Sequence, residues 1–233
     1  MLILAIDSTA TVASVALCKN GSTLAQYTVN AGNTHSVTLL PMIEHMLKMA
    51  GAELSDIDLF AASVGPGSFT GVRIGTSTIK GLAHGRDIPC VGVSTLEALA
   101  YNLRGCGTVI CPAMNARRGQ VYTAIFEDTT EGIKRLSEDK AISVTELASR
   151  LSDFEGEVRF TGDGYSLVSH MTEYETPELY RLQSAVSVAA VAEKLYNEAD
   201  DKSSFTPASL NPTYLRKPQA EREREERLMA EGN

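Results

Sequence analysis

The sequence predicts a mixed α/β fold, because three strand-like segments open the chain and helical and strand-like segments then alternate. The opening segments are Leu2–Asp7, Thr11–Cys18 and Ser22–Val29, which are rich in apolar and β-branched residues. Asn20-Gly21 lies between the last two, and this dipeptide is the strongest short signal for a β-hairpin. The resulting order, three strands followed by α, β, α, β and α, matches a ribonuclease-H-like unit.

The elements after the hairpin complete this unit. Apolar residues recur at helical spacing from about Ser36 to Ala50, and Gly51 ends the pattern. A continuous apolar run then predicts a buried strand, and a glycine-rich loop leads into the next helix. The remaining expected elements are strand Leu59–Val64, loop Gly65–Gly71, a helix to about His84, strand Ile88–Val93 and helix Thr95–Leu103.

The character of the sequence changes after residue 104, where we expect a first lobe, 1–104, to end. A smaller second lobe is expected over 105–204, and the extended segment 205–218, with three prolines, is expected to rejoin the first lobe. Residues 219–233 contain the charge run EREREER, which is typical of a solvated tail. The elements expected in the second lobe are strands Thr108–Met114, Gln120–Phe126 and Val158–Thr161 and helices Val144–Leu151 and Ser184–Asp200.

Composition bounds the classes of function. The 233 residues are 43% hydrophobic and 21% charged, as in an ordinary globular protein. The formal net charge of −8 argues against broad unaided attraction to nucleic acid, since lysine and arginine supply affinity for phosphate. The apolar runs fall short of the roughly 20 residues of a membrane helix, so no membrane partner is expected. The four cysteines form no CxxC pair, and a reducing cytoplasm is the expected location.

The glycine-rich segment SVGPGSFTGVRIG, residues 63–75, combines a strand end, a loop and a helix start, which suits an anion. Its spacing fails the known phosphate fingerprints, because Thr70 stands where GxGxxG needs glycine and no Gly-Lys-Ser/Thr follows. A tight turn that needs glycine is the alternative. The candidates for weak nucleotide or anion binding are Asp7, Ser8, Thr9, Gly65, Gly67 and Ser68.

Small residues recur on the helix after this loop, at Gly71, Gly75 and Gly81. Such residues let a neighbouring helix approach closely, and the helix over residues 36–50 is apolar enough to be that neighbour. Internal packing and a subunit interface are both compatible with the pattern. The candidate interface residues are His35, Leu39, Ile43, Met46, Val72, Gly75, Thr76 and Ile79.

Metal and nucleophile motifs are missing from the sequence. His35 and His45 are ten residues apart, His84 and His170 stand alone, and no HxxxH or HExxH is present. No metal site is therefore expected. The sequence has no GxSxG motif either, so a serine hydrolase of the α/β-hydrolase type is not indicated.

Five segments carry a further signal: LILAIDST at the N-terminus, THSVTLLPMIEHML, SVGPGSFTGVRIGTSTIKGLA, NARRGQVYTAIF and PTYLR. They cover nearly the whole chain except the charged tail, and they resemble the bacterial TsaB (YeaZ) family. The resemblance implies the ASKHA (actin/Hsp70-like) fold, with two ribonuclease-H-like lobes of which the second is reduced. It also implies a non-catalytic partner of TsaD, which makes threonylcarbamoyladenosine beside the anticodon of tRNA together with the ATPase TsaE.

The sequence departs from the catalytic sister family at one motif. TsaD-like proteins carry a metal-binding HxxxH after the glycine-rich loop and the next strand, where this chain has Thr95 and Leu99. Neither side chain can replace an imidazole at a metal. The second lobe offers only Gly162-Asp163-Gly164 as a phosphate loop. We therefore expect no tightly bound cofactor in this chain, with ATP or ADP and the metal belonging mainly to partner subunits.

The resemblance also implies how the partners meet. Helices over about 36–50 and 70–83 would pair with TsaD, and the same surface would form a homodimer in isolation. tRNA would be bound through the assembled complex, with Arg73, Arg117 and Arg118 as the modest candidates in this chain. Two alternatives stay open: an ATP-dependent phosphotransferase of the same fold, based on Asp7 and the 65–71 loop, and a glycoprotease-like peptidase.

Overall fold

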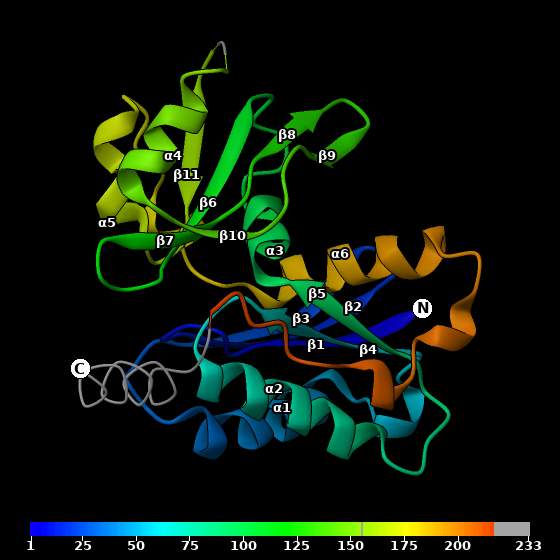
Figure 1. Ribbon diagram of the computed structural model, residues 1–233. Coiled ribbons are helices and arrows are strands. Elements are labelled where there is room, and N and C mark those ends of the chain that lie inside the picture. Colours follow the sequence, from blue (N-terminus) through cyan, green and yellow to red (C-terminus); the bar gives the residue numbers. More distant parts are fainter. Residues whose placement is uncertain (155, 217–233) are drawn as a thin grey trace, which may run out of the picture.

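The computed structural model describes residues 1–154 and 156–216, so the charged tail expected over 219–233 lies outside the described residues. Two lobes meet at helix α3, Thr95–Tyr101, as Figure 1 shows. No helix within the described ranges is long and apolar enough to cross a membrane.

The first lobe is built on a five-stranded sheet with the strand order β3-β2-β1-β4-β5. Strands β1, β2 and β3 are antiparallel, whereas β4 runs parallel to β1 and β5 runs parallel to β4. This is the ribonuclease-H-like arrangement that the sequence predicts. The strand bounds are β1 Leu2–Asp7, β2 Ala13–Lys19, β3 Ser22–Val29, β4 Leu59–Gly65 and β5 Cys90–Ser94.

Helices cover both faces of this sheet. Alternate residues of β1 point to opposite faces, so Leu4 and Ile6 pack against α1, His35–Ala50, and α2, Phe69–Ala83, while Ile3 and Ala5 pack against α6, Ala185–Glu198. A short 3₁₀ turn, η1 Leu54–Asp56, leads from α1 into β4. The sheet is thus buried on both faces, which explains the continuous apolar runs of β1 and β4.

The position of α6 corrects the expected division of the chain. Residues 105–204 are expected in the second lobe, but α6 lies on the first sheet, where Val188 and Val191 are buried. The buried side of α6 consists mainly of alanine and valine, and these small side chains allow close packing on the sheet. The Ala185 N–H also donates to the Ser14 hydroxyl oxygen at 3.0 Å, which fixes the start of the helix on β2.

The segment after α6 runs along the first lobe, past the 3₁₀ turns η4 Lys202–Ser204 and η5 Pro207–Ser209. The Cys90 N–H donates to the Phe205 carbonyl, and the Thr213 N–H donates to the Val64 carbonyl. The segment therefore covers the β5 edge of the sheet. It was expected over 205–218, and its last two residues lie outside the described ranges.

The second lobe holds a sheet of order β10-β7-β6-β8-β9, with β11 parallel to β6. The strand expected over Gln120–Phe126 is two strands, because Ile125 leaves the ladder with β6: its N–H donates to the Ser137 hydroxyl oxygen, and its carbonyl accepts from Leu136. The strand bounds are β6 Val109–Asn115, β7 Gln120–Thr123, β8 Phe126–Thr129, β9 Gly132–Arg135, β10 Lys140–Ser143 and β11 Val158–Thr161.

Two further core clusters hold the second lobe. Leu96 and Leu99 of α3 pack with Ile110 and Phe126 on the face toward the first lobe. On the other face, Leu147 and Phe160 form the core together with α4 and α5. The helical elements here are α4 Val144–Leu151, α5 Tyr165–Val168, η2 Ser169–Met171 and η3 Glu178–Tyr180.

Candidate functional site

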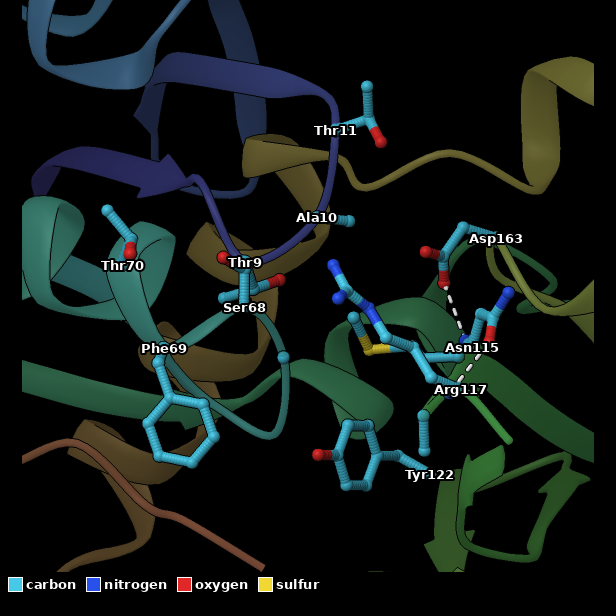
Figure 2. Close-up of a pocket in the computed structure, with 13 residues that line it drawn as sticks. Thr9, Ala10, Thr11, Ser68, Phe69, Thr70, Asn115, Arg117, Tyr122 and Asp163 are labelled. Carbon is cyan, nitrogen blue, oxygen red and sulfur yellow. Dashed lines mark hydrogen bonds between the residues drawn. The ribbon is translucent and has the colours of Figure 1, made fainter. Parts of the chain in front are cut away.

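A pocket of about 550 Å³ lies between the two lobes. The first lobe contributes the turn after β1 and the start of α2, and the second lobe contributes the β6–β7 hairpin and the loop after β11 (Figure 2). The lining residues are Thr9, Ala10, Thr11, Gly67, Ser68, Phe69, Thr70, Met114, Asn115, Ala116, Arg117, Tyr122 and Asp163. Of the six predicted anion-binding residues, Thr9, Gly67 and Ser68 line this pocket, whereas Asp7, Ser8 and Gly65 do not.

Asp7, at the end of β1, is 1% exposed, and both of its carboxylate oxygens are hydrogen-bonded within the first lobe. Oδ1 accepts from the Thr9 N–H at 2.9 Å and from the Thr9 hydroxyl at 2.8 Å, and Oδ2 accepts from the Ser63 hydroxyl. Burial raises the pKa of Asp7, and the hydrogen bonds from Ser63 and Thr9 oppose that shift. Asp7 therefore holds the β1 turn in place.

The glycines of the 65–75 segment allow close backbone approach. A Cβ on Gly67 would lie 2.4 Å from the Thr9 carbonyl oxygen, and a Cβ on Gly71 would lie 2.0 Å from the Ser8 carbonyl oxygen. Gly65 has a positive φ of 113°, and a Cβ there would lie 2.4 Å from the Thr213 carbonyl oxygen. These positions need glycine because of packing and backbone conformation, which is the alternative that the sequence left open.

Ser8 and Ser68 also have structural partners. The Ser8 hydroxyl donates to the Gly71 carbonyl oxygen at 2.9 Å, beneath the start of α2. Ser68 is the N-cap of α2, since its side chain accepts from the Gly71 N–H at 3.3 Å, and its own N–H donates to the Thr9 carbonyl at 2.7 Å. Two groups that could have bound an anion thus hold the helix start on β1.

On the second-lobe side, Asp163 accepts a hydrogen bond from the Asn115 N–H at 3.2 Å. Burial raises the pKa of Asp163, and the negative charge of Asp7 raises it further. Gly162 has a φ of 102°, and a Cβ there would lie 2.4 Å from the Ala113 carbonyl oxygen. The predicted loop 162–164 thus lies at the pocket, packed on β6 as the first-lobe loop is packed on β1.

The β6–β7 hairpin brings Arg117 to the pocket. Arg117 and Arg118 adopt left-handed φ values of 64° and 55°, and the Arg117 N–H donates to the Asn115 side-chain oxygen at 2.8 Å. Sequence reasoning named both arginines but missed Asn115 and Tyr122, which also line the pocket. Both residues lie in the NARRGQVYTAIF segment, but the segment alone does not show that they line a pocket, because the pocket forms where the lobes meet.

The predicted interface residues require a correction. Seven of them are buried inside this chain: Leu39, Ile43, Met46, Val72, Gly75, Thr76 and Ile79. Regular apolar spacing marks the inward side of a helix on a sheet, so the pattern found the core of the first lobe. A Cβ on Gly75 would lie 2.6 Å from the Ser8 hydroxyl oxygen, so this glycine serves internal packing as well. The eighth residue, His35, contacts the Ala10 carbonyl oxygen at 2.7 Å and is only partly buried.

An apolar groove of about 530 Å³ lies between α1 and α2, and two of the eight predicted interface residues, His35 and Leu39, line it. Leu40 of α1 is 53% exposed at this groove, and Val37, one turn earlier, is 68% exposed. We call this surface the α1–α2 groove; its lining residues are His35, Ser36, Leu39, Leu40, Ile74, Ser77, Thr78, Gly81 and Leu82.

Comparison with known proteins identifies the family. The chain is 34% identical to the tRNA threonylcarbamoyladenosine biosynthesis protein TsaB of Bacillus subtilis, over 74% of this chain and 76% of that protein. It is 37% identical to the protein of the same description from Escherichia coli, over 71% and 72%. The chain belongs to the TsaB (YeaZ) family. A sequence model of the wider TsaD family, described as tRNA N6-adenosine threonylcarbamoyltransferase, also matches residues 29–223.

Solved structures agree with the TsaB assignment. YeaZ from Pseudomonas aeruginosa superimposes with a TM-score of 0.79 at 25% identity, covering 92% of this chain and 99% of that chain. Component A of the (R)-2-hydroxyglutaryl-CoA dehydratase of Acidaminococcus fermentans has a TM-score of 0.50 at 13% identity, covering 85% and 100%, which shows the fold alone. The TsaB-family chain therefore has the two-lobed ASKHA fold.

The positions that replace the TsaD-type histidines in this TsaB-family chain are buried. Thr95 begins α3 and is 0% exposed, and Leu99 lies in the core between the lobes. The described residues contain no group of three or more His, Cys, Asp or Glu side chains that could hold a metal ion. Neither α3 nor its surroundings therefore offers the ligands that the catalytic sister family is expected to use.

Proposed function

We propose that this chain acts in tRNA threonylcarbamoyladenosine biosynthesis as a non-catalytic partner that binds and activates a TsaD-type transferase. The observation that carries the proposal is the α1–α2 groove, an apolar surface on two adjacent helices that packs against nothing in the described chain. Exposed apolar patches of this kind are typical of protein interfaces. Family membership supports the pathway, and the groove supports the role of a partner subunit.

The groove suits a helical partner. Ser36 and Leu40 are four residues apart on the side of α1 that lines the groove. Ile74, Thr78 and Leu82 follow the facing side of α2. A Cβ on Gly81 would have nothing within 4 Å, so another backbone could approach there. We propose a helix-bundle interface with the transferase, and a homodimer through the same groove when the transferase is absent.

The chemistry of the four cysteines argues against a cysteine peptidase. Burial raises the pKa of Cys111 to about 12 and that of Cys90 to about 11. Burial also raises the pKa of Cys18 and Cys106, so all four thiols are protonated near neutral pH. Cysteine nucleophiles act as thiolates, so these side chains are unsuited to covalent catalysis.

The environment of Asp7 argues against the phosphotransferase alternative. An ATP-dependent enzyme of this fold needs an acidic group that faces magnesium and phosphate, and both oxygens of Asp7 are bonded to Thr9 and Ser63 instead. The Ser68 N–H is likewise bonded to Thr9. We propose that the chain alone binds no nucleotide tightly, and that ATP or ADP and the metal belong to the TsaD-type and TsaE-type partners.

The test is threonylcarbamoyl transfer to tRNA in a mixture of the source organism's TsaD-type transferase, TsaE-type ATPase, carbamoyl-adenylate synthase and this chain. Each component is omitted in turn. We expect omission of this chain to abolish modification and the chain alone to modify nothing. Modification that proceeds at full rate without this chain would overturn the proposal.

A further inference from the structure

Basic side chains from three elements lie along one side of the first lobe and the adjoining hairpin. We call them the cationic strip: Arg73 and Lys80 of α2, Arg216 of the C-terminal segment, and Arg117 and Arg118 of the β6–β7 hairpin. Hydrogen bonds connect the first three to neighbouring elements. Arg73 Nε donates to the Tyr214 hydroxyl oxygen at 2.7 Å, Lys80 Nζ to Asn211 Oδ1 at 3.5 Å, and Arg216 Nη1 to the Ala116 carbonyl oxygen at 2.7 Å.

These contacts leave positive charge unneutralised. Arg73, Lys80 and Arg216 bind a phenol, an amide and a carbonyl, which are all neutral groups. Four arginines of the second lobe and the segment after it, Arg135, Arg150, Arg159 and Arg181, differ in that each forms a salt bridge with a carboxylate. Arg73, Lys80 and Arg216 thus concentrate positive charge along the 211–216 segment of a protein whose net charge is −8.

The C-terminal segment positions the strip rigidly. The Thr213 N–H donates to the Val64 carbonyl oxygen at 2.7 Å, and only glycine fits at position 65 beneath Thr213. The Tyr214 ring stacks on Phe69 with a centroid distance of 4.6 Å, and the Arg73 guanidinium lies 5.5 Å from the Tyr214 ring centroid. The PTYLR motif thus fixes one strip cation, Arg73, and supplies another, Arg216.

The strip and the α1–α2 groove occupy different sides of α2. Ile74, Thr78 and Leu82 face the groove, whereas Arg73 and Lys80 contact the 211–216 segment. Seven residues along a helix span about 10 Å, so these two cations suit separate phosphates of a chain rather than one small anion. The arginines of the hairpin extend the strip further, toward the pocket that Arg117 lines (Figure 2).

We propose that the cationic strip contacts the phosphate backbone of RNA that spans this chain and the partner docked in the adjoining groove. This inference rests on the proposed function, because the second subunit supplies the rest of the RNA-binding surface. The other end of the molecule cannot serve this purpose, since residues 144–180 carry seven described acidic side chains and only Arg150 and Arg159 as arginines. RNA affinity from a short strip is weak in the isolated chain and becomes useful once the complex adds contacts.

The test measures tRNA binding by the complex of this chain with the TsaD-type transferase, at several salt concentrations. The variant is R73Q/R216Q, and the control is R150Q, which removes an arginine charge from the acidic end of the second lobe. We expect the double variant to weaken binding at least about 10-fold and to reduce the slope of log affinity against log salt by about 2. The control should bind as the unchanged complex does.

Co-elution with the transferase shows separately that the double variant still forms the complex. If the complex stays intact and tRNA affinity and the salt slope are unchanged, the proposal that the strip contacts RNA is wrong. Loss of co-elution would show that Arg73 or Arg216 serves the protein interface instead, which would also contradict the proposal. Competition by ATP as strong as that by an RNA homopolymer of equal phosphate concentration would also overturn it, because the strip would then be a nucleotide site.

A second measurement separates this inference from the proposed function. If the omission assay fails, so that modification does not need this chain, the strip is tested on the isolated chain at low salt. We expect weak RNA binding that R73Q/R216Q removes and R150Q retains. Equal binding by all three proteins would overturn the strip independently of the role in the complex.

Discussion

The two lobes border the pocket with similar structural elements, but these elements make different contacts. Each lobe has an aspartate and a glycine-containing loop beside the end of a strand, and both loops reach the pocket. In the first lobe, Asp7 is bonded inward and the loop continues into the 15-residue helix α2, while in the second lobe Asp163 lines the pocket and its loop continues into the 4-residue α5. The comparison teaches that the first-lobe loop supports packing; under the proposals made above, the outer sides of α2 carry the contacts with the transferase and with RNA.

The largest expected effect comes from the closest approach in the first lobe. G71V would drive a side chain into the Ser8 carbonyl oxygen, which lies 2.0 Å from a Cβ at this position. We expect this variant to lose its folded state, measured by circular dichroism and urea denaturation. The control is G81A, in the same helix and with open space around it, which should stabilise the chain by about 0.5–1 kcal/mol. Equal stability of the two variants would contradict the conclusion that close packing requires glycine at position 71.

The next effect separates the inner and outer sides of α1. Leu39 is 1% exposed in the first-lobe core, so L39A should lower the free energy of unfolding by about 2–5 kcal/mol. L40A should change it by less than about 0.5 kcal/mol, because Leu40 lies on the exposed side. Chemical denaturation of both variants measures the difference. Similar losses would mean that the groove is part of the folded core.

A smaller effect is the pH dependence of stability in variants of the two aspartates, Asp7 and Asp163. The folded-state pKa of Asp7 is raised by burial, so the folded chain binds this proton more tightly than the unfolded chain does. Stability therefore falls as pH rises from the ordinary aspartate pKa through the raised one, and the full cost is present above it. D7N should remove this loss, so its stability relative to the unchanged protein should increase from pH 4 to pH 8. The pKa of Asp163 is also raised, so the stability of D163N relative to the unchanged protein should likewise increase with pH.

A pH-independent difference between D7N and the unchanged protein would contradict the inward role of Asp7. Urea denaturation at each pH provides the measurement. The variant keeps an oxygen that can accept from Thr9, so the turn after β1 can form in both proteins.

The smallest effect concerns how Arg73 is positioned. Y214F keeps the ring that stacks on Phe69 but removes the hydroxyl that accepts from Arg73 Nε. We expect a loss of about 2- to 5-fold in tRNA affinity of the complex, with the salt slope nearly unchanged, because no charge is removed. A loss as large as that of R73Q/R216Q would mean that the tyrosine hydroxyl itself contacts RNA.

The first lobe was largely predictable because its signals are local. The Asn20-Gly21 turn predicts the pairing of β2 with β3, the continuous apolar run predicts that β4 is buried, and the periodicity of α1 predicts a helix with a buried side. The same periodicity misled the choice of interface residues. Leu39, Leu40 and Ile43 all belong to the apolar pattern expected for this helix, yet Leu39 and Ile43 are buried whereas Leu40 is 53% exposed.

The second lobe and the pocket depend on contacts between distant segments. An amphipathic helix such as α6 shows which side is buried but not which sheet covers it, so its place on the first lobe was missed. Ile125 leaves the β7 ladder for Ser137, a contact that no periodicity predicts. Asn115 and Tyr122 join Ser68 at the pocket only because α3 brings the two lobes together.

The measurement that tests the central claim most directly is the affinity of this chain for the TsaD-type transferase after a charge is placed in the groove. The variant is L40D, and the control is L179D, at a leucine of the second lobe that is 77% exposed. We predict that both variants fold, that L40D binds at least about 10-fold more weakly and fails to support threonylcarbamoyl transfer, and that L179D behaves as the unchanged chain. Full binding and activity of L40D would contradict the account.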